Sequence, residues 1–440
     1  MTDATSMAED FASGRSDPVQ ALEQALAQVD QSASVFISLT AERARREAQA
    51  SAARWRACQP LSTLDGVPLA WKDLFDVAGS VTTAGAAYRR NAPAALLDAP
   101  SVGLLCRAGM VSVGKTNLSE LAYSGLGLNP HFGTPHNPHG SDQPRIPGGS
   151  SSGSAVAVAA GIVPIAMGTD TAGSIRIPAA FNGLVGYRSS SRRYSRDGVF
   201  PLAHTLDSLG PLTRSVRDAL AIDDLLHGRR QSHTARSLKG QRFVLAQQDV
   251  EPAVGNNLLR AVEQLKAQGA LIEERECAPF QATLELIKHH GWLGAFEAFA
   301  LHQTLLDSPD AEQLDPRVRR RLEAARALPA SQLLHLLDAR RRLQQQLVDD
   351  LDGAILMTPT VAHVAPALAP LEADDDLFVK TNLATLRLTM PGSLLDMPGV
   401  TLPSGRDAQG LPTGLLLSAP VGEDARLLRA ALSVESVLNV

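Results

Sequence analysis

Cysteine is scarce in this sequence. The chain of 440 residues has three, Cys58, Cys106 and Cys277, which stand far apart and form no Cys-x-x-Cys pair. A disulfide framework or a zinc knuckle needs several cysteines at close and regular spacing. The sequence therefore argues against both, and we expect no metal site and a reducing compartment.

Long hydrophobic runs and long runs of one charge are missing as well. No uninterrupted apolar stretch reaches the roughly 18 residues that a membrane-spanning helix needs. Residues 1–14 lack the basic region followed by an apolar run that marks a secretory signal. Lys and Arg number 41 against 46 Asp and Glu, a net charge of −5 with no basic tract, which argues against nucleic acid as a direct ligand. We expect a cytoplasmic protein that binds neither membranes nor nucleic acid directly.

Hydrophobic residues, by contrast, are plentiful, because they make up 44% of the chain against 20% charged residues. A chain of this length and composition can bury a large core. Strand-like segments at 242–246 and 271–274 flank helical spacing at 256–268, which is the alternation typical of an α/β protein. No internal repeat or low-complexity tract interrupts it.

Periodicity and breaker residues also predict local elements. We expect two surface helices within residues 17–57, split near residues 32–38. A helix at 101–108 should lead into a strand at 110–114 and then into a second helix that opens near Asn117. Residues 181–186 and 197–212 have the pattern of short strands.

Two loops rich in glycine and serine carry the strongest signal of chemistry. The first reads GGSSSGS over residues 148–154 and the second GTDTAGS over residues 168–174, with an apolar segment between them. Each holds a serine where backbone can approach closely, Ser150 and Ser174, 24 positions apart. A hydroxyl at the end of such a turn, backed by several N–H groups, suits a nucleophile beside an oxyanion hole, whereas a solvated linker would not contain interleaved Val, Ile and Ala. On this pattern alone, either serine can be the nucleophile.

Lys72 interrupts the apolar strand pattern GVPLAWKDLFDVAG of residues 66–79. Burial disfavours the ammonium form and lowers a lysine pKa, which can turn the side chain into a base near neutral pH. The alternative is a lysine that reaches solvent from the end of a strand, or that pairs with Asp73 or Asp76. The pattern leaves both interpretations open.

Residues 109–116 match the phosphate-binding pattern GxxxxGK[ST], and Ser112 with Lys115 also matches SxxK. In a P-loop the strand precedes the first glycine, and the next four residues form the anion-binding turn. Here those four residues, Met-Val-Ser-Val, themselves have the pattern of a strand. We therefore reject both motifs.

His131, His136 and His139 lie in one loop, HFGTPHNPH. Pro135 and Pro138 impose extended backbone around them, which works against their convergence on a metal ion. We expect solvent-exposed loop histidines.

Four arginines stand close together in the segment after the second loop: Arg188, Arg192, Arg193 and Arg196. The cluster can hold an anionic substrate group or belong to a solvated loop, and we favour the loop.

Taken together, Lys72 in GVPLAWKDLFDVAG, the loop GGSSSGS and the loop GTDTAGSIRIPA resemble the amidase signature family of serine hydrolases. The likeness continues in GKTNLSELAYSG, in SRDGVFPLAHTLDSLGPLTRSV, in the MTPT strand end and in GLPTGLLLSAP. It implies an α/β fold, a single large domain with a central mixed β-sheet flanked by helices on both faces. Within this single domain of residues 1–440 we expect an N-terminal helical segment (1–60), a catalytic core (61–226), a variable and mostly helical region (227–350) and a C-terminal part that completes the sheet (351–440).

The resemblance also implies a Ser-Ser-Lys triad. Ser174 would be the nucleophile, Ser150 the bridging serine whose preceding peptide is cis in this family, and Lys72 the base. The oxyanion hole would be formed by the backbone N–H groups of Thr171, Ala172, Gly173 and Ser174. Supporting positions that brace the loops would be Ser151, Asp170 and Arg176.

Some residues depart from the family pattern. Ala172 and Ser152 stand where most members have glycine, and Tyr187-Arg188-Ser189-Ser190 replaces the common Leu-Lys-Pro-Thr. None of these changes removes a triad residue, so we expect catalysis to be kept and specificity to differ.

The resemblance implies an amidase without a cofactor, a hydrolase of linear amides. Its substrate would be a small carboxamide, a urea-like compound or an amino-acid amide, cleaved through an acyl-enzyme with release of ammonia or a small amine. The alternative within the same chemistry is a glutamine-hydrolysing A-type subunit of an amidotransferase, which needs a partner. Alternatives of another class are a nucleotide-binding protein and an inactive scaffold. A homodimer is the assembly that the resemblance suggests, and the substrate pocket is not identified.

Overall fold

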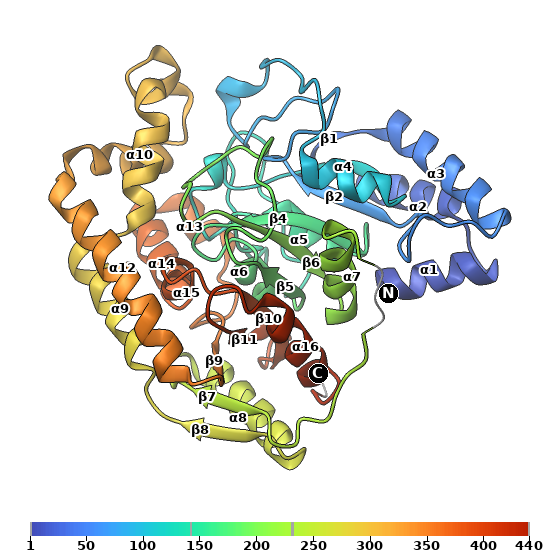
Figure 1. Ribbon diagram of the computed structural model, residues 1–440. Helices are drawn as coiled ribbons and strands as arrows, with labels where there is room; N and C mark the ends of the chain where they lie inside the picture. The colour runs from blue at the N-terminus through green and yellow to red at the C-terminus, as the bar shows by residue number, and fades with distance from the viewer. Residues whose placement is uncertain (1, 141–142, 230–232, 439–440) are drawn as a thin grey trace.

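The computed structural model describes residues 2–140, 143–229 and 233–438. The strands of this part of the chain form one sheet of eleven, in the order β1-β3-β2-β4-β6-β5-β10-β11-β9-β7-β8 (Figure 1). The strands are β1 (Phe36–Leu39), β2 (Pro68–Lys72), β3 (Val111–Thr116), β4 (Ile165–Asp170), β5 (Val185–Arg188), β6 (Ser208–Thr213), β7 (Arg242–Leu245), β8 (Leu271–Glu274), β9 (Ile355–Pro359), β10 (Gly399–Arg406) and β11 (Pro412–Ser418).

The sheet is mixed. β2 is parallel to both β3 and β4, and β7 is parallel to both β8 and β9. The other neighbouring strands are antiparallel. The prediction of a single large domain built on a central mixed sheet with flanking helices is confirmed.

Helices surround the sheet. The α-helices are α1 (Ala4–Ser13), α2 (Pro18–Val29), α3 (Ala41–Arg56), α4 (Pro100–Arg107), α5 (Ser152–Ala159), α6 (Arg176–Phe181), α7 (Val216–Leu226), α8 (Pro252–Ala267), α9 (Ala278–His290), α10 (Leu293–Leu306), α11 (Pro316–Ala324), α12 (Ala330–Leu351), α13 (Leu368–Ala373), α14 (Asp375–Leu386), α15 (Met390–Leu394) and α16 (Asp424–Glu435). Short 3-10 turns are η1 (Ala87–Arg89), η2 (Glu120–Ala122), η3 (Pro309–Gln313) and η4 (Ala325–Ala327).

Side chains of β2 alternate between the two faces of the sheet, as the pleat requires. Leu69 and Trp71 join one apolar cluster, whereas Ala70 between them joins another. The second cluster also contains the side chains of α5. Lys72 follows Ala70 by two positions, so it lies on the α5 side of the sheet.

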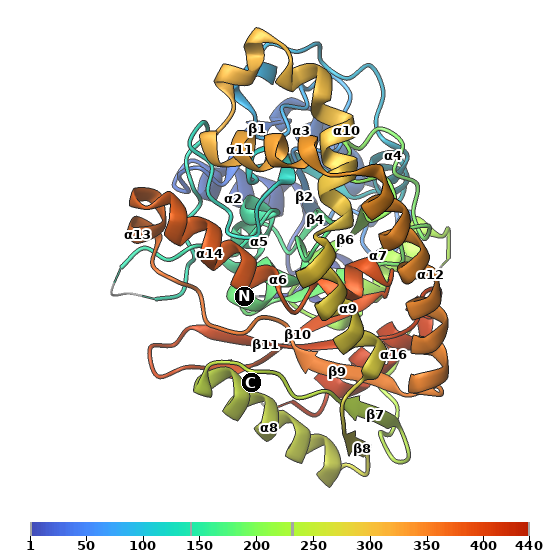
Figure 2. The same cartoon turned by 90° about the vertical axis from the view of Figure 1, so that its left-hand side faces the viewer.

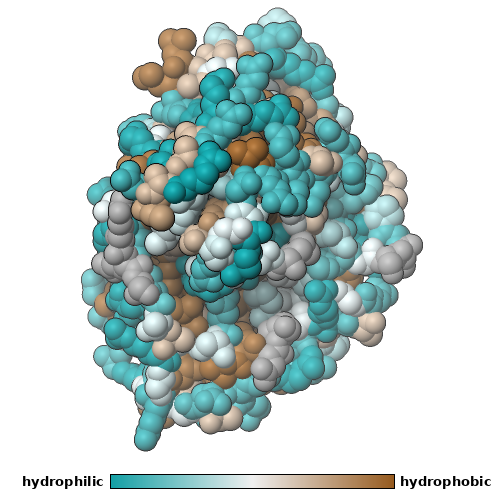
Figure 3. All heavy atoms as spheres, turned by 90° about the vertical axis from the view of Figure 1, so that its right-hand side faces the viewer, coloured by the Kyte–Doolittle hydropathy of each residue, from teal (hydrophilic) through white to brown (hydrophobic). Residues whose placement is uncertain are grey.

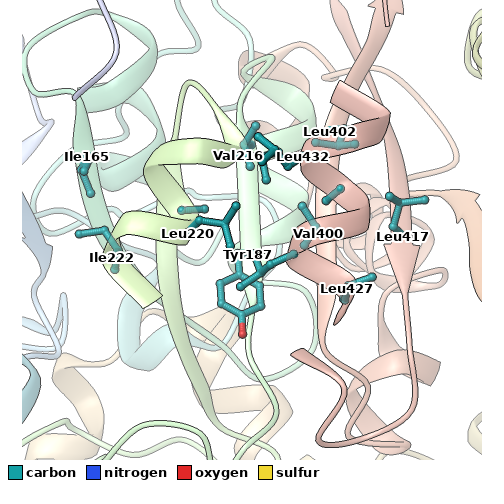
Figure 4. Packing of buried hydrophobic residues seen from close by; sticks show 14 of the residues in the cluster. Ile165, Tyr187, Val216, Leu220, Ile222, Val400, Leu402, Leu417, Leu427 and Leu432 are labelled. Atoms are coloured by element: carbon teal, nitrogen blue, oxygen red, sulfur yellow. The ribbon is translucent and has the colours of Figure 1, made fainter. Parts of the chain in front are cut away.

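The larger cluster fills the other face, between the sheet and helices α7, α8 and α16. Figure 4 shows part of it, where side chains of α7 and α16 meet those of the strands. The labelled residues are Ile165, Tyr187, Val216, Leu220, Ile222, Val400, Leu402, Leu417, Leu427 and Leu432.

Helix α5 is buried along its whole length and consists of small residues, SGSAVAVA. A side chain at Gly153 would meet the Val35 carbonyl oxygen at 2.4 Å and the Asn117 nitrogen at 2.6 Å. Small side chains therefore let the helix lie directly against neighbouring backbone. The apolar segment between the two Gly/Ser loops is part of the core, and it holds both loops at fixed positions.

Helices α9, α10 and α12 lie along one side of the molecule, where Figures 1 and 2 show them as a layer beside the sheet. The opposite side is largely hydrophilic, with hydrophobic residues in small separate areas (Figure 3). None of the helices in the described ranges combines the length and the apolar character that crossing a bilayer requires.

The two helices predicted within residues 17–57 are confirmed as α2 and α3, and the break between them holds a strand that was not predicted, β1, which pairs with β3. Two local predictions are wrong. No α-helix opens near Asn117 in the described chain, because Leu121 and Ala122 have positive φ angles of 50° and 59°, which an α-helix excludes. The predicted strand at 181–186 begins only at Val185, and that at 197–212 is reduced to its end, β6.

Glu435, at the end of α16, accepts a hydrogen bond from the Val216 N–H at 2.8 Å, and burial raises its pKa to about 7. Asp218 and Asp3 raise it further, and Arg217 opposes them. Protonated Glu435 favours the folded state. Its contribution to the free energy of unfolding is fully present below the ordinary glutamate pKa of 4.5 and is lost as the pH rises through the folded-state pKa of about 7.

We therefore expect Glu435→Gln to stabilise the protein at pH 8 by about 1–3 kcal/mol. The two proteins should converge in stability as the pH falls towards 4.5. Thermal unfolding of both across this range measures the difference. A Glu435→Gln protein that is less stable than wild type at pH 8 would contradict the raised pKa.

Candidate active site

Two of the three predicted triad residues come from the ends of neighbouring parallel strands. Lys72 is the last residue of β2, and Ser174 follows the end of β4, which pairs with β2. Ser150 lies in the loop that leads into α5. Because the carboxyl ends of parallel strands meet at one edge, residues 102 positions apart in the sequence lie in one site.

Lys72 donates hydrogen bonds from Nζ to Ser150 Oγ at 2.7 Å and to Thr169 Oγ1 at 2.8 Å. Its side chain is fully buried, and burial lowers its pKa to about 7, against the opposing attraction of Asp170 and Asp207. The alternative in which Lys72 pairs with Asp73 does not hold, because Asp73 binds Lys115 Nζ at 2.6 Å. Lys72 is thus able to accept a proton near neutral pH.

The peptide between Gly149 and Ser150 is cis. Backbone hydrogen bonds hold this peptide on both sides: the Gly149 N–H donates to the Gly125 carbonyl at 2.8 Å, and the Ser119 N–H donates to the Ser150 carbonyl at 3.1 Å. A side chain at Gly149 would meet the Gly127 nitrogen at 2.6 Å. The Ser150 hydroxyl is therefore presented to Lys72 by a tightly packed turn.

Ser174 is buried, with an exposed fraction of 4%, and its hydroxyl has no hydrogen-bond partner among the described residues. Lys72 and Ser150 are thus brought into contact, whereas Ser174 Oγ does not bond to Ser150 in this structure. Hydrogen bonds between catalytic groups often tighten only when substrate is bound. The loop itself is anchored, since the Ser151 N–H donates to the Ser174 carbonyl at 3.3 Å.

The turn before Ser174 carries the predicted oxyanion donors. In the chain that the structure describes, the N–H groups of Thr171, Ala172 and Ser174 have no acceptor. The Gly173 N–H, however, donates to Asp170 Oδ1 at 2.8 Å. The predicted set is therefore corrected to three donors, because an internal carboxylate already occupies the fourth.

Asp170 and Arg176 form the support behind this turn. Asp170 accepts from Arg176 Nε and Nη2, each at 2.9 Å, and from the Ile175 N–H at 3.1 Å. Burial raises the pKa of Asp170, but Arg176 and Arg188 outweigh this effect and lower it to about 2. Arg176 also donates to the Thr389 carbonyl at 3.0 Å, so the turn is tied to the segment before α15.

Ser151 connects the two loops. Besides its backbone bond to Ser174, its hydroxyl donates to the Thr169 carbonyl at 3.3 Å. Thr169 was not singled out from the sequence, although it binds Lys72 directly. The sequence feature that could have identified Thr169 was its position in GTDTAGS, one residue before Asp170 at the end of a strand.

The arginine cluster is divided by the fold, and the favoured interpretation as a solvated loop is wrong for Arg188. This residue is fully buried at the end of β5, where Nη1 donates to the Met397 carbonyl at 2.8 Å and Nε lies 3.6 Å from Asp170 Oδ1. Arg193 pairs with Asp223 at 2.6 Å, whereas Arg192 is exposed. Burial of Arg188 depends on long-range partners that sequence spacing does not reveal.

A cavity of about 590 Å³ lies near the site, but none of the three predicted triad residues lines it. Its wall includes Thr169, which binds Lys72, and Asp207, which accepts from Thr171 Oγ1 at 2.6 Å. Arg192 and Arg196 also line it.

The other sequence motifs do not form sites. Residues 111–116 are strand β3, so the GxxxxGKT letters form no anion-binding turn. His136 is exposed as expected. His131 and His139 are partly buried, His131 against Glu120 at 2.9 Å and His139 with Nε2 3.1 Å from the Asn182 carbonyl oxygen, which corrects the prediction for both residues. Within residues 2–140, 143–229 and 233–438, no group of three or more His, Cys, Asp and Glu side chains is placed to hold a metal ion.

Known proteins resemble this chain along most of its length. The Amidase family model matches residues 17–428. The chain is 33% identical over 393 residues to the 2-amino-5-chloromuconic acid deaminase of Comamonas testosteroni, covering 87% of this chain and 83% of that protein. It is also 33% identical over 455 residues to the A subunit of the glutamyl-tRNA(Gln) amidotransferase of Prochlorococcus marinus (strain MIT 9303), covering 94% and 92%. A solved structure described as the crystal structure of amidase superposes with a TM-score of 0.87 at 34% identity, covering 100% of both chains.

Proposed function

We propose that this chain, which belongs to the amidase signature family, hydrolyses the C–N bond of a small carboxamide, a urea-like compound or an amino-acid amide. Ammonia or a small amine would be released through an acyl-enzyme. The observation that carries the proposal is the contact of 2.7 Å between a fully buried Lys72 and the Ser150 hydroxyl. Burial lowers the pKa of Lys72 to about 7, so its amine can be neutral near pH 7 and can act as a base.

Acylation begins when the Ser174 hydroxyl attacks the amide carbonyl carbon. Ser150 accepts the proton of Ser174 and passes its own proton to the neutral amine of Lys72. The carbonyl oxygen becomes an oxyanion, which the N–H groups of Thr171, Ala172 and Ser174 would bind, since they have no acceptor in the described chain. The C–N bond then breaks as the proton on Lys72 returns through Ser150 to the leaving nitrogen.

Deacylation repeats these transfers with water in place of Ser174. Water gives its proton to Ser150 as its oxygen attacks the acyl carbon, and the acyl–oxygen bond to Ser174 breaks. The proton returns to Ser174 Oγ, which restores the free enzyme and releases a carboxylic acid. No cofactor is needed at any step.

A second candidate is a glutamine-hydrolysing subunit of an amidotransferase. The similarity to the A subunit of glutamyl-tRNA(Gln) amidotransferase, over 94% of this chain, favours it. This role requires a partner that accepts the ammonia. It differs from the first proposal in its dependence on that partner.

Ammonia release from a panel of primary carboxamides, ureas and amino-acid amides tests the proposal. We expect the purified chain alone to turn over members of at least one class, without ATP and without a second protein. Hydrolysis of glutamine only in the presence of a co-purifying protein would favour the second candidate. No turnover of the panel, together with no reaction of Ser174 with a fluorophosphonate, would contradict both.

A further inference from the structure

A second buried carboxylate, Asp207, lies beside the turn that carries the predicted oxyanion donors. Strands β4 and β6 are antiparallel, and the last pair of their ladder is Asp170 with Ser208. The next residues beyond this pair are Thr171 on one strand and Asp207 on the other. Thr171 Oγ1 donates to Asp207 Oδ1 at 2.6 Å, so the register of the sheet brings the carboxylate to the first residue of the turn.

The other oxygen of this carboxylate is held by backbone. Asp207 Oδ2 accepts from the Leu202 N–H at 2.9 Å and from the Ala203 N–H at 3.0 Å. Three donors on two oxygens are the pattern of an ionised carboxylate. Burial raises the pKa of Asp207, and these three hydrogen bonds together with the charge of Arg196 lower it. The side chain is therefore fixed in position by the protein itself.

Asp207 differs from Asp170 because it has no cationic partner. Asp170 lies 2.9 Å from Arg176 and 3.6 Å from Arg188. No lysine, arginine or histidine of the described chain lies within 4.0 Å of the Asp207 carboxylate, whose partners are a hydroxyl and two N–H groups. A charge that no neighbour neutralises acts more strongly inside a protein than in water.

Lys72 is the cation on which this charge acts. Burial lowers the pKa of Lys72, whereas Asp170 and Asp207 attract its ammonium form and oppose that effect. Asp73, the next residue in the chain, is paired with Lys115 at 2.6 Å. Helix α5, on the same side of the sheet as Lys72, contains no charged residue. Asp207 is therefore the anion near Lys72 that no cation neutralises.

We propose that Asp207 is a positioning residue for the amide hydrolysis proposed above, on which this inference rests. Its carboxylate holds Thr171, one of the three proposed oxyanion donors, and its charge stabilises the Lys72 ammonium that forms as Ser174 loses its proton. The transition state has a negative charge on the carbonyl oxygen and a positive charge on the base. One carboxylate thus acts on the groups that receive both charges.

Asp207→Asn removes the charge and keeps the size of the side chain. Without the attraction of Asp207 the Lys72 ammonium is less stable, so the acidic limb of the pH profile should move to lower pH by about one unit. The plateau value of kcat should fall about tenfold, because Lys72 becomes a weaker base.

Thr171→Val removes the hydroxyl that binds Asp207 and keeps the charge. The acidic limb should stay at the wild-type position, because Asp207 still attracts Lys72. We expect kcat to fall about tenfold with KM within about twofold of wild type, because a displaced oxyanion donor affects the transition state more than the bound substrate. Thr171→Ser, which restores the hydroxyl, should recover most of kcat.

Two measurements across pH 5.5 to pH 9 report these effects. The first is kcat and KM for the amide of the panel that the wild type hydrolyses fastest. The second is the rate constant for the reaction of Ser174 with a fluorophosphonate, which also requires removal of the Ser174 proton and does not depend on the choice of amide. The shift of the acidic limb in Asp207→Asn should appear in both.

Asp218→Asn is the matched control. Asp218 is also a buried carboxylate with three donors, the Thr5 hydroxyl at 2.7 Å and the N–H groups of Ala4 and Thr5 at 2.7 Å and 2.9 Å. It is not among the charges that act on Lys72. Asp218→Asn should keep the wild-type limb and the wild-type kcat, even if its Tm falls as much as that of Asp207→Asn.

Three results would overturn the proposal: a folded Asp207→Asn with the acidic limb of the wild type, a Thr171→Val protein with the wild-type kcat, or the same limb shift in Asp218→Asn. If Asp207→Asn does not fold, Asp207→Ser decides in its place, because its hydroxyl accepts a hydrogen bond without carrying a charge. A limb at lower pH then supports the proposal, and an unmoved limb overturns it. Hydrolysis with an unmoved limb rejects only the role of Asp207, whereas no hydrolysis and no labelling of Ser174 rejects the amidase function.

Discussion

Ser174→Ala is expected to lower kcat for amide hydrolysis by about 10⁴-fold or more, because it removes the oxygen that forms the acyl-enzyme. The substitution should leave stability nearly unchanged, since the Ser174 hydroxyl has no hydrogen-bond partner in the described structure. Steady-state ammonia release measures the first effect and thermal unfolding the second. Reaction with a fluorophosphonate, followed by mass spectrometry, should place the adduct on the peptide that contains Ser174.

Ser331→Ala is a matched control, because Ser331 lies exposed at the start of α12. It should keep wild-type activity and labelling. Turnover by Ser174→Ala within tenfold of wild type would exclude Ser174 as the nucleophile. An adduct on Ser150 in the wild type would reverse the two roles.

The pH dependence of kcat/KM should show an acidic limb that belongs to Lys72. The base must be neutral, and the pKa of Lys72 is lowered to about 7, so activity should fall about tenfold for each pH unit below that value. Above it the rate should level off. Lys72→Met, which keeps the length of the side chain without its amine, should lose about 10³-fold or more in kcat.

Lys239→Met provides the comparison, because Lys239 is exposed and distant in sequence from the site. It should show the wild-type profile. Activity that stays constant from pH 8 down to pH 5.5 would contradict a neutral-lysine base. The neutral-lysine base would also be contradicted if the residual activity of Lys72→Met showed the same acidic limb in its pH profile as the wild type.

Much of the site follows from short stretches of sequence. Close contact between backbone segments requires small residues, and the sequence shows them directly at glycines 148, 149 and 153 and along α5. The contacts that a side chain at Gly149 or Gly153 would make illustrate this requirement. The α/β class followed from the alternation of strand-like and helical segments, whereas the mixed sheet was implied by the resemblance to a family. The roles of Lys72, Ser150 and Ser174 came from resemblance to a family, and they remain to be tested by the substitutions above.

What the sequence did not reveal depends on contacts between distant segments. Thr169 meets Lys72 because β2 and β4 pair in one particular register. Arg188 is buried because Asp170 and Asp396 converge on it from far away in the chain. The Gly173 N–H donates to the Asp170 carboxylate, and the spacing of residues in the sequence does not predict this hydrogen bond.

The full burial of Lys72 has a consequence for the fate of the proton. Its Nζ reaches only Ser150 and Thr169 among the described residues, so a proton taken up from Ser174 has no direct path to bulk water. In the proposed mechanism the proton would therefore leave through Ser150 and would be carried to the leaving nitrogen rather than exchanged with solvent. Two hydroxyl protons then move in one step, and rates measured in mixtures of H₂O and D₂O should fall along a curve instead of a straight line.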